Sequence, residues 1–253
     1  MGLGGCRFGQ NRQPIWDHKR GLIIDTIRAS NIGYSINKRP ILAQKGSLTI
    51  NRHDLVCING PSGGGKTTLL NVLSGLCKSS GEVLWGDINI NNPTGRLSID
   101  QLRMDWISMI FQEPRLAKSL SGWENIYLPL KISGRFNTLD QPLLEQLLNT
   151  FFLSEGQPFG ELDKQLRRKA NTFSSGQMQR IAIIRAIMTL PKYIFADEIL
   201  NSVEPELQDK TWSAIKQICR DRRIGFLLVT HNQCLLKDPD FSQNITIVNG
   251  AFE

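Results

Sequence analysis

The residues with the most evident chemistry are 60–68, which read Gly-Pro-Ser-Gly-Gly-Gly-Lys-Thr-Thr. They fit the pattern G-x-x-x-x-G-K-[ST], in which a glycine-rich turn directs several backbone N–H groups at one phosphate. In such a turn the Lys66 ammonium reaches the β- and γ-phosphates of a nucleotide, and the Thr67 hydroxyl holds Mg²⁺. A glycine-rich turn that matches by chance is the alternative for this motif taken alone. The predicted nucleotide-binding residues are Gly60, Pro61, Ser62, Gly63, Gly64, Gly65, Lys66, Thr67 and Thr68.

Two adjacent acids, Asp197 and Glu198, follow an apolar run at residues 193–196 that suits a buried strand. Beside a phosphate-binding loop, the first acid can position Mg²⁺, directly or through water. The second can polarise an attacking water as a general base. An ordinary junction between a strand and a loop explains the same pair, so the interpretation depends on the residues that accompany it.

His231 and Gln112 also follow apolar runs, at residues 226–229 and 109–111. The carboxyl ends of parallel strands lie along one rim of a sheet, which places His231 on the rim with the two acids. We expect it to contact the γ-phosphate, although a lone histidine often has a structural role. Gln112 could ligate Mg²⁺ through its side-chain carbonyl and sense the phosphate. The predicted catalytic residues are therefore Glu198, His231 and Gln112, and the predicted metal ligands are Thr67, Gln112 and Asp197.

A second glycine-containing motif, at residues 173–180, reads Phe-Ser-Ser-Gly-Gln-Met-Gln-Arg. Ser174 suits the N-cap of the helix that follows, and a serine, a glycine and a helix N-terminus form a second anion-binding surface. One triphosphate does not need two such surfaces from one chain, whereas two chains meeting head to tail would contribute one each. We therefore add Ser174, Gly176 and Gln177 to the predicted nucleotide-binding residues.

Apolar runs predict the strands that carry these residues. Runs at residues 55–58, 193–196 and 226–229 alternate with helical patterns, which indicates a parallel sheet covered on both faces. Shorter runs near the N-terminus are typical of antiparallel strands. These N-terminal runs are at residues 22–24, 41–42 and 48–50. The remaining strand candidates are at residues 81–87, 106–111 and 245–248.

Helical spacing characterises much of the segment from about 114 to 172. Asp140 and Pro142 open a pattern whose apolar members recur at helical intervals and are expected to form core. These members are Leu143, Leu144, Leu147, Leu148, Phe151 and Phe152. Residues 177–188 and 207–219 predict two more helices. The segment from about 114 to 172 predicts a helical subdomain inserted in an α/β body.

Composition narrows the class of protein. With 253 residues, 40% of them hydrophobic, the chain should fold around a substantial core. No apolar run approaches the ~20 residues that span a bilayer, so a role in transport would need a separate membrane protein. The net charge of +7 comes from scattered basic residues without interleaved aromatics, which favours a solvated surface over a nucleic-acid groove. Five cysteines without C-x-x-C spacing indicate a reduced chain with no disulfide frame or zinc site.

Taken in order, these motifs resemble the ATPase subunits of ABC transporters. The family's order is an aromatic that stacks on adenine, here Tyr34, then the phosphate loop, Gln112, the signature at residues 173–177, the acidic pair and His231. The resemblance covers about residue 22 to the end. It implies an α/β fold: a P-loop NTPase core with a mostly parallel sheet, an N-terminal antiparallel β subdomain and an inserted helical subdomain. Residues 21–253 would form this single domain, with the helical part at about 114–180, after a flexible extension of residues 1–20.

The resemblance also implies an activity. ATP with Mg²⁺ would lie between the phosphate loop of one protomer and the signature of another. Glu198 would be the general base, His231 would contact the γ-phosphate, and Gln112 would link the metal to the lobe that touches the membrane partner. The implied partners are transmembrane permease subunits and a second copy or a paralogous ATPase, with no nucleic acid. The implied location is peripheral, on the cytoplasmic face of the inner (plasma) membrane.

The sequence departs from the family pattern in three places. The signature usually reads Leu-Ser-Gly-Gly-Gln, whereas Phe173 and Ser175 stand here at its first and third positions. Ile199 and Leu200 occupy positions where proline and then threonine or serine are usual. Glu204 ends a loop that commonly ends in aspartate. Because every group that touches the scissile phosphate is present, we predict hydrolysis, at a rate that these departures can lower.

Two other functions fit part of the sequence. A non-transport ABC ATPase acting on DNA or the ribosome would agree with the net charge, but this chain has one cassette and no sustained heptads. A degenerate cassette would bind ATP and regulate without cleaving it. Cargo and direction stay open, because residues 111–116 resemble ATPases of small-anion importers while residues 123–130 resemble those of lipoprotein release and macrolide export.

Overall fold

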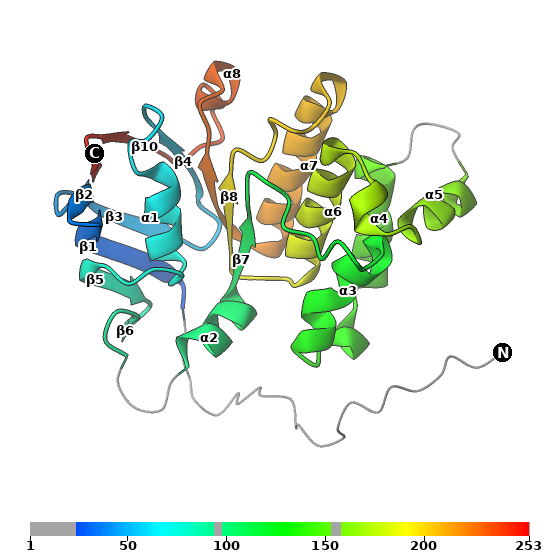
Figure 1. Ribbon diagram of the computed structural model, residues 1–253, viewed down its shortest axis with the longest axis horizontal. Helices are drawn as coiled ribbons and strands as arrows, with labels where there is room; N and C mark the ends of the chain where they lie inside the picture. The colour runs from blue at the N-terminus through cyan, green and yellow to red at the C-terminus, as the bar shows by residue number, and fades with distance from the viewer. Residues whose placement is uncertain (1–23, 94–97, 153–157, 253) are drawn as a thin grey trace.

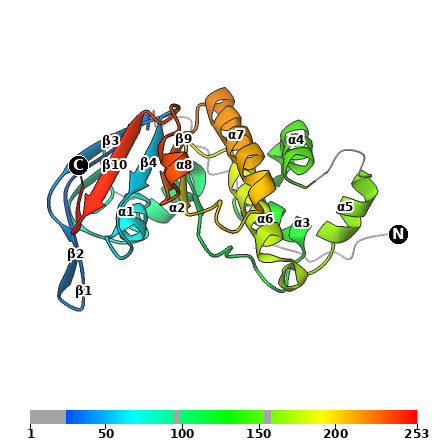
Figure 2. The same cartoon turned by 90° about the horizontal axis from the view of Figure 1, so that it is seen from above.

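Two β-sheets and a set of helices make up residues 24–93, 98–152 and 158–252, the part of the chain that the computed structural model describes (Figure 1). The predicted extension at residues 1–20 lies outside the described residues. Seen from above, helices α3 to α7 gather at the end of the molecule away from the antiparallel strands (Figure 2). Within the described ranges, no helix combines the length and the apolar character needed to cross a membrane.

The larger sheet has six strands in the order β11-β10-β4-β9-β8-β7. The strands from β10 to β7 are parallel, and the short β11 is antiparallel to β10. Strands β4, β8 and β9 are almost wholly buried, as expected for apolar runs covered on both faces. The bounds are β4 Leu55–Asn59, β7 Ile107–Ile110, β8 Tyr193–Asp197, β9 Gly225–Val229, β10 Gln243–Val248 and β11 Ala251–Phe252.

The smaller sheet is antiparallel, and its long strand β1 pairs with β2, β3 and β5. The bounds are β1 Thr26–Ile36, β2 Arg39–Ala43, β3 Ser47–Asn51, β5 Ser80–Trp85 and β6 Ile88–Asn89. The strand predicted at residues 22–24 is wrong where it can be checked. Ile24 precedes β1, because pairing with β3 begins at Thr26, yet its side chain belongs to the core. Leu22 and Ile23 lie outside the described residues.

The helices follow the predicted pattern in part. Asp140 caps α4 by accepting a hydrogen bond from the Leu143 N–H at 3.0 Å, and the predicted apolar stripe of this helix is buried through Phe151. Trp106, predicted as strand, is instead the last residue of a helix. The bounds are α1 Lys66–Leu73, α2 Ile99–Trp106, α3 Gly122–Ile132, α4 Gln141–Phe151, α5 Phe159–Leu166, α6 Ser175–Met188, α7 Pro205–Arg222 and α8 Gln233–Leu236.

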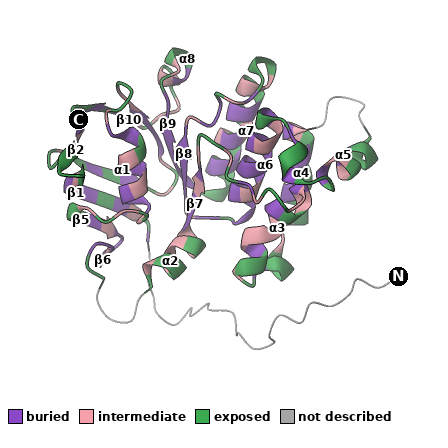
Figure 3. Cartoon of the chain, viewed as in Figure 1, coloured by how far each residue is buried: buried purple, intermediate pink, exposed green. Residues whose placement is uncertain are grey.

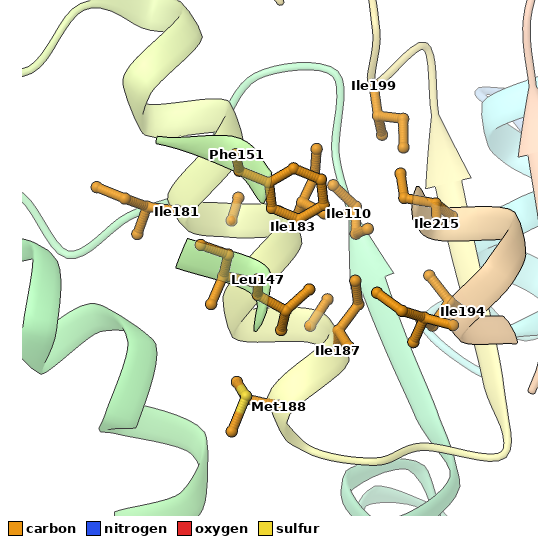
Figure 4. Close-up of a cluster of buried hydrophobic side chains, with 14 of the residues drawn as sticks. Ile110, Leu147, Phe151, Ile181, Ile183, Ile187, Met188, Ile194, Ile199 and Ile215 are labelled. Carbon is orange, nitrogen blue, oxygen red and sulfur yellow. The ribbon is translucent and has the colours of Figure 1, made fainter. Parts of the chain in front are cut away.

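The parallel sheet separates two hydrophobic cores, so that its strands are buried on both faces (Figure 3). Alternation along β8 shows the division, because Tyr193 and Phe195 join one core and Ile194 and Ala196 join the other. The first core includes α1 and the antiparallel sheet. The second is formed with α4, α6 and α7, and part of it appears in Figure 4. The sheet is thereby packed on both faces, and the ends of its strands can position the residues of a site.

Candidate active site

The predicted site residues gather at the carboxyl ends of neighbouring parallel strands. The loop of residues 60–68 follows β4, Asp197 ends β8 and Glu198 comes directly after it. His231 lies two residues beyond β9, and Gln112 two residues beyond β7. Because β4, β9, β8 and β7 are successive neighbours, these segments share one rim of the sheet.

The loop of residues 60–68 ends in helix α1. Gly65 is the N-cap, in a left-handed conformation, and provides no side-chain cap. The N–H groups of the first helical turn are therefore available to an anion. The Lys66 ammonium donates to the carbonyl oxygens of Gly60 and Pro61, each at 2.9 Å, and Lys66 is 8% exposed. A buried cation beside uncapped helix N–H groups is a donor set that suits a polyphosphate.

Thr67 and Asp197 join this loop to strand β8. Thr67 Oγ1 donates to Asp197 Oδ2 at 2.6 Å. Burial raises the pKa of Asp197; the Thr67 bond and the Lys66 charge lower it, and the charge of Glu198 raises it. Hydroxyl and carboxylate oxygens are ligands that Mg²⁺ prefers, and a cation here would offset the cost of burying the carboxylate. The pair therefore fits a divalent metal.

We expect Asp197→Asn to raise the free energy of unfolding of the nucleotide-free protein by about 1 kcal/mol. Since burial raises the pKa of this carboxyl, the ionised form is disfavoured in the folded state at pH 7. This cost is lost as the pH falls below the ordinary aspartate pKa, where the folded and unfolded states are both protonated. Asparagine keeps an oxygen that can accept from Thr67.

Denaturant unfolding at pH 7 and at pH 3, without nucleotide or metal, checks this expectation. The exposed α7 residue Asp209 provides the matched control, Asp209→Asn. A loss of stability at pH 7 in Asp197→Asn would mean that the Thr67 bond outweighs the burial of the charge.

Three side chains converge on the carboxylate of Glu198. Its Oε2 accepts hydrogen bonds from Gln112 Nε2 at 3.1 Å and from Asn201 Nδ2 at 2.9 Å. Its Oε1 lies 3.0 Å from His231 Nδ1. The side chain of Glu198 is 16% exposed and that of His231 62%. The structure thus brings together Gln112, Glu198 and His231, and it adds Asn201, whose only sequence signal is an amide three residues after the acid.

Buried side chains anchor the turn that follows Glu198. The backbone of Glu198 is left-handed, with φ +49°, and the Asn201 N–H donates to the Glu198 carbonyl at 3.2 Å. Ile199 and Leu200, which stand where proline and a hydroxyl residue are usual, are both buried, and Ile199 lies near Ile215 of α7 (Figure 4). Burying each aliphatic side chain contributes about 1.5–3 kcal/mol. That offsets the roughly 1–2 kcal/mol cost of the left-handed residue.

The second predicted anion-binding motif forms the start of α6. Ser174 Oγ accepts from the Gln177 N–H at 3.2 Å, and Gln177 Oε1 accepts from the Ser174 N–H at 3.1 Å. A Cβ atom on Gly176 would lie 2.8 Å from the carbonyl oxygen of Ser202, so glycine permits this close approach. Among the described residues, no hydrogen bond joins these three motif residues to the loop at 60–68. The structure does not bring the two motifs of one chain together.

An ion pair that the sequence did not predict ties α6 to the loop after Glu198. Arg180 Nη2 lies 3.3 Å from Glu204 Oε1, and Arg180 Nη1 donates to the Phe151 carbonyl at 3.0 Å. Burial lowers the pKa of Arg180, and the charge of Glu204 raises it. Glu204, which departs from the usual aspartate, therefore contacts the motif helix of its own chain.

Tyr34 is half-buried on β1, opposite Leu42 of β2. Leu42 in turn packs against the phosphate loop, since a Cβ on Gly65 would lie 3.1 Å from Leu42 Cδ2. A hydrogen bond with the Cys77 side chain raises the pKa of Tyr34. Leu42 thus lies between Tyr34 and the phosphate loop, and the contact of Tyr34 with adenine stays a prediction.

Comparison with known proteins identifies a family and several relatives that this chain resembles. A profile described as ABC transporter matches residues 43–201. The chain is 31% identical to the lipoprotein-releasing system ATP-binding protein LolD 1 of Rhodopseudomonas palustris, over 90% of this chain and 96% of that protein. It is 29% identical to the methionine import ATP-binding protein MetN 1 of the same species, of which it spans 59%. A solved dimeric ATP-binding cassette, MJ0796 bound to ADP and Pi, matches with a TM-score of 0.73 and 26% identity, over 90% of this chain and 96% of that one.

The family match covers more than half of the chain, which therefore belongs to the ABC transporter family. Within that family it is an ATP-binding subunit, that is, a transport ATPase. The predicted α/β P-loop fold and the predicted protein class are confirmed.

Proposed function

We propose that ATP is hydrolysed with Glu198 as the general base and that hydrolysis moves a substrate through a separate transmembrane permease. In this proposal the loop at residues 60–68 binds the phosphates and Tyr34 stacks on the adenine. Thr67, Asp197 and Gln112 would hold Mg²⁺, which supplies neutralising charge to the phosphates when bound. The proposal concerns the ATPase step, and the methionine-import and lipoprotein-releasing relatives are both named as ATP-binding proteins.

The convergence on Glu198 is the observation that carries this proposal. A general base must be held in one orientation to take a proton from water, and side chains after β7 and β9 orient this carboxylate from two directions. Gln112 donates through Nε2, which leaves its carbonyl oxygen for a cation. The His231 side chain is 62% exposed against 16% for Glu198, which supports a contact with the γ-phosphate.

A second protomer would complete the site. The signature residues Ser174, Gly176 and Gln177 lie at the N-terminus of α6, where Ser174 and Gln177 form a capping box, separate from the phosphate loop of the same chain. A helix N-terminus attracts anions. We propose that two copies, or this chain and a paralogue, close head to tail over ATP so that each signature meets the partner's loop at residues 60–68.

Cross-linking tests this arrangement. Ser62→Cys and Ser174→Cys would be combined in a background lacking Cys6, Cys77 and Cys234, and a short bismaleimide added. We expect a dimer-sized product that depends on Mg²⁺ and a non-hydrolysable ATP analogue. Each single variant is the control. A product that forms equally without nucleotide, or none with it, would contradict the head-to-tail dimer.

We further propose the setting and the domain division of the chain. The ATPase would lie peripherally on the cytoplasmic face of the inner (plasma) membrane, bound to permease subunits. Names of relatives support this, since LolD belongs to a releasing system and MetN to an import system. Residues 21–253 would form one domain, and a helical subdomain would occupy about 114–180. Contacts of α3 and α4 with α6 support the latter.

A further inference from the structure

We propose that Asn201 is a positioning residue for ATP hydrolysis, which holds the Glu198 carboxylate through Oε2 so that Oε1 faces the water that gives up its proton. The inference rests on the proposed role of Glu198 as general base. It assigns a function to a residue at which the sequence carries no recognised motif.

Counting the acceptor sites of the Glu198 carboxylate leads to this assignment. Each carboxylate oxygen has about two lone-pair sites. On Oε2 both are occupied, by Gln112 Nε2 at 3.1 Å and Asn201 Nδ2 at 2.9 Å. On Oε1 one is occupied by His231 Nδ1 at 3.0 Å. Among the residues that the structure describes, no donor occupies the second site of Oε1, so this site can receive a water molecule.

The backbone around Asn201 explains why its amide can act as a fixed donor. Glu198 N donates to the Val229 carbonyl of β9 at 2.9 Å, and Asn201 N donates back to the Glu198 carbonyl at 3.2 Å. Between them, Ile199 and Leu200 are buried in the second core. The backbone of Glu198 and that of Asn201 are therefore both held by contacts that do not involve the Asn201 side chain.

The two amides on Oε2 differ in what can move them. Gln112 follows β7 and is itself a predicted metal ligand, so a cation bound to its carbonyl oxygen would also constrain the position of its Nε2 atom. Asn201 belongs to the same turn as Glu198 and keeps its donor beside Oε2 whatever Gln112 contacts. We infer that Asn201 holds the base in place during the step in which Gln112 serves the metal.

Two substitutions test whether Asn201 acts as a hydrogen-bond donor to Glu198 or only stabilises the local turn. Asn201→Ala removes the amide, and we expect kcat to fall about tenfold, the effect of one lost hydrogen bond, with KM and Kd for ATP within about twofold. Asn201→Asp keeps the size and the turn preference of asparagine but replaces the donor with a second carboxylate. If the donor matters, kcat of Asn201→Asp falls at least as far as that of Asn201→Ala. If only the turn matters, Asn201→Asp retains wild-type kcat, and the inference is overturned.

A matched control is available on α7, where Gln217 Nε2 donates to Asp221 Oδ1 at 2.8 Å on the exposed surface. Gln217→Ala removes the same kind of bond, and its kcat should stay at the wild-type value. Thermal unfolding of all variants checks that they are folded. Equal kcat in Asn201→Ala and wild type, or a rise in KM with unchanged kcat, would refute the positioning role.

Glu198→Gln distinguishes this inference from the proposal on which it rests. If Glu198→Gln still turns over, the general-base assignment fails and Asn201 loses its proposed role with it. If Glu198→Gln is inactive while Asn201→Ala and Asn201→Asp are normal, only the inference about Asn201 fails. If the general-base role and the positioning role are both correct, adding Asn201→Ala to Glu198→Gln should cause no further tenfold loss of kcat. The effects of substitutions at residues that act as a unit are not additive.

Discussion

The variant Glu198→Gln is expected to hydrolyse ATP at least about 100-fold more slowly than the wild-type protein while still binding ATP. Glutamine matches glutamate in size and keeps an oxygen that can accept from Gln112 and Asn201. What it lacks is a basic oxygen, so the positioned group can no longer take a proton from water. Phosphate release, measured with the permease partner present, gives the rate, and a fluorescent nucleotide gives the affinity.

Glu206→Gln is the matched control for this result. Glu206 is exposed in the first turn of α7, eight residues after Glu198. Its turnover should equal that of the wild type. Retained turnover in Glu198→Gln would remove the carboxylate from the chemical step. Lost nucleotide binding would instead give it a role in holding ATP.

The strands that carry the site could be predicted from the sequence because their burial is continuous. Strands β4, β8 and β9 are apolar on both faces, so each shows as one uninterrupted run. Helix α4 was equally visible, since its stripe ending in Phe151 recurs at helical spacing. Helix α2 has no fully buried residue, but Ile99, Leu102 and Trp106 recur at helical spacing and pack half-buried against the first core, so this helix could have been predicted. Helix α3 contains Pro129, which weakens any helical prediction.

The site could be predicted where its function depends on local backbone. The loop at residues 60–68 contains its whole geometry within one segment, and the capping box of Ser174 and Gln177 is also local. The shared rim of parallel strand ends also predicted that His231 lies near Glu198, but other side-chain contacts between elements were not predictable. The Arg180–Glu204 pair and the Asn201–Glu198 bond depend on how the turn after β8 folds. That turn is set by tertiary burial of Ile199 and Leu200, which no local pattern reveals.

Two of the three departures from the family pattern, at Ile199 and Leu200 and at Glu204, fall on this same turn, and the structure gives these two one physical account. Proline would stiffen the segment after Glu198 through its fixed φ. Here Ile199 and Leu200 hold the segment by burial. The longer arm of Glu204 reaches Arg180 of its own chain. The turn is therefore held from within the protomer, and the base beside it keeps its orientation.

The variant Lys66→Ala is expected to bind ATP about 100-fold more weakly, a loss of roughly 3 kcal/mol. The Lys66 ammonium is buried in the loop, and its hydrogen bonds with the Gly60 and Pro61 carbonyls direct it inward. A phosphate that replaces these carbonyls would gain a charge-assisted bond at low dielectric. Without the ammonium, the helix N–H groups of α1 must hold the phosphates alone.

Stability and binding must be separated in this variant, because both carbonyl acceptors lose their donor. Lys66→Met keeps most of the side-chain volume, and Lys210→Ala removes an exposed lysine of α7 as the matched control. Nucleotide titration at a temperature where all variants are folded should show the same weak binding in Lys66→Met and Lys66→Ala, and wild-type binding in Lys210→Ala. Unchanged affinity in Lys66→Met would mean that the loop binds phosphate through its backbone. In that case the buried cation would serve the fold of the loop rather than the nucleotide.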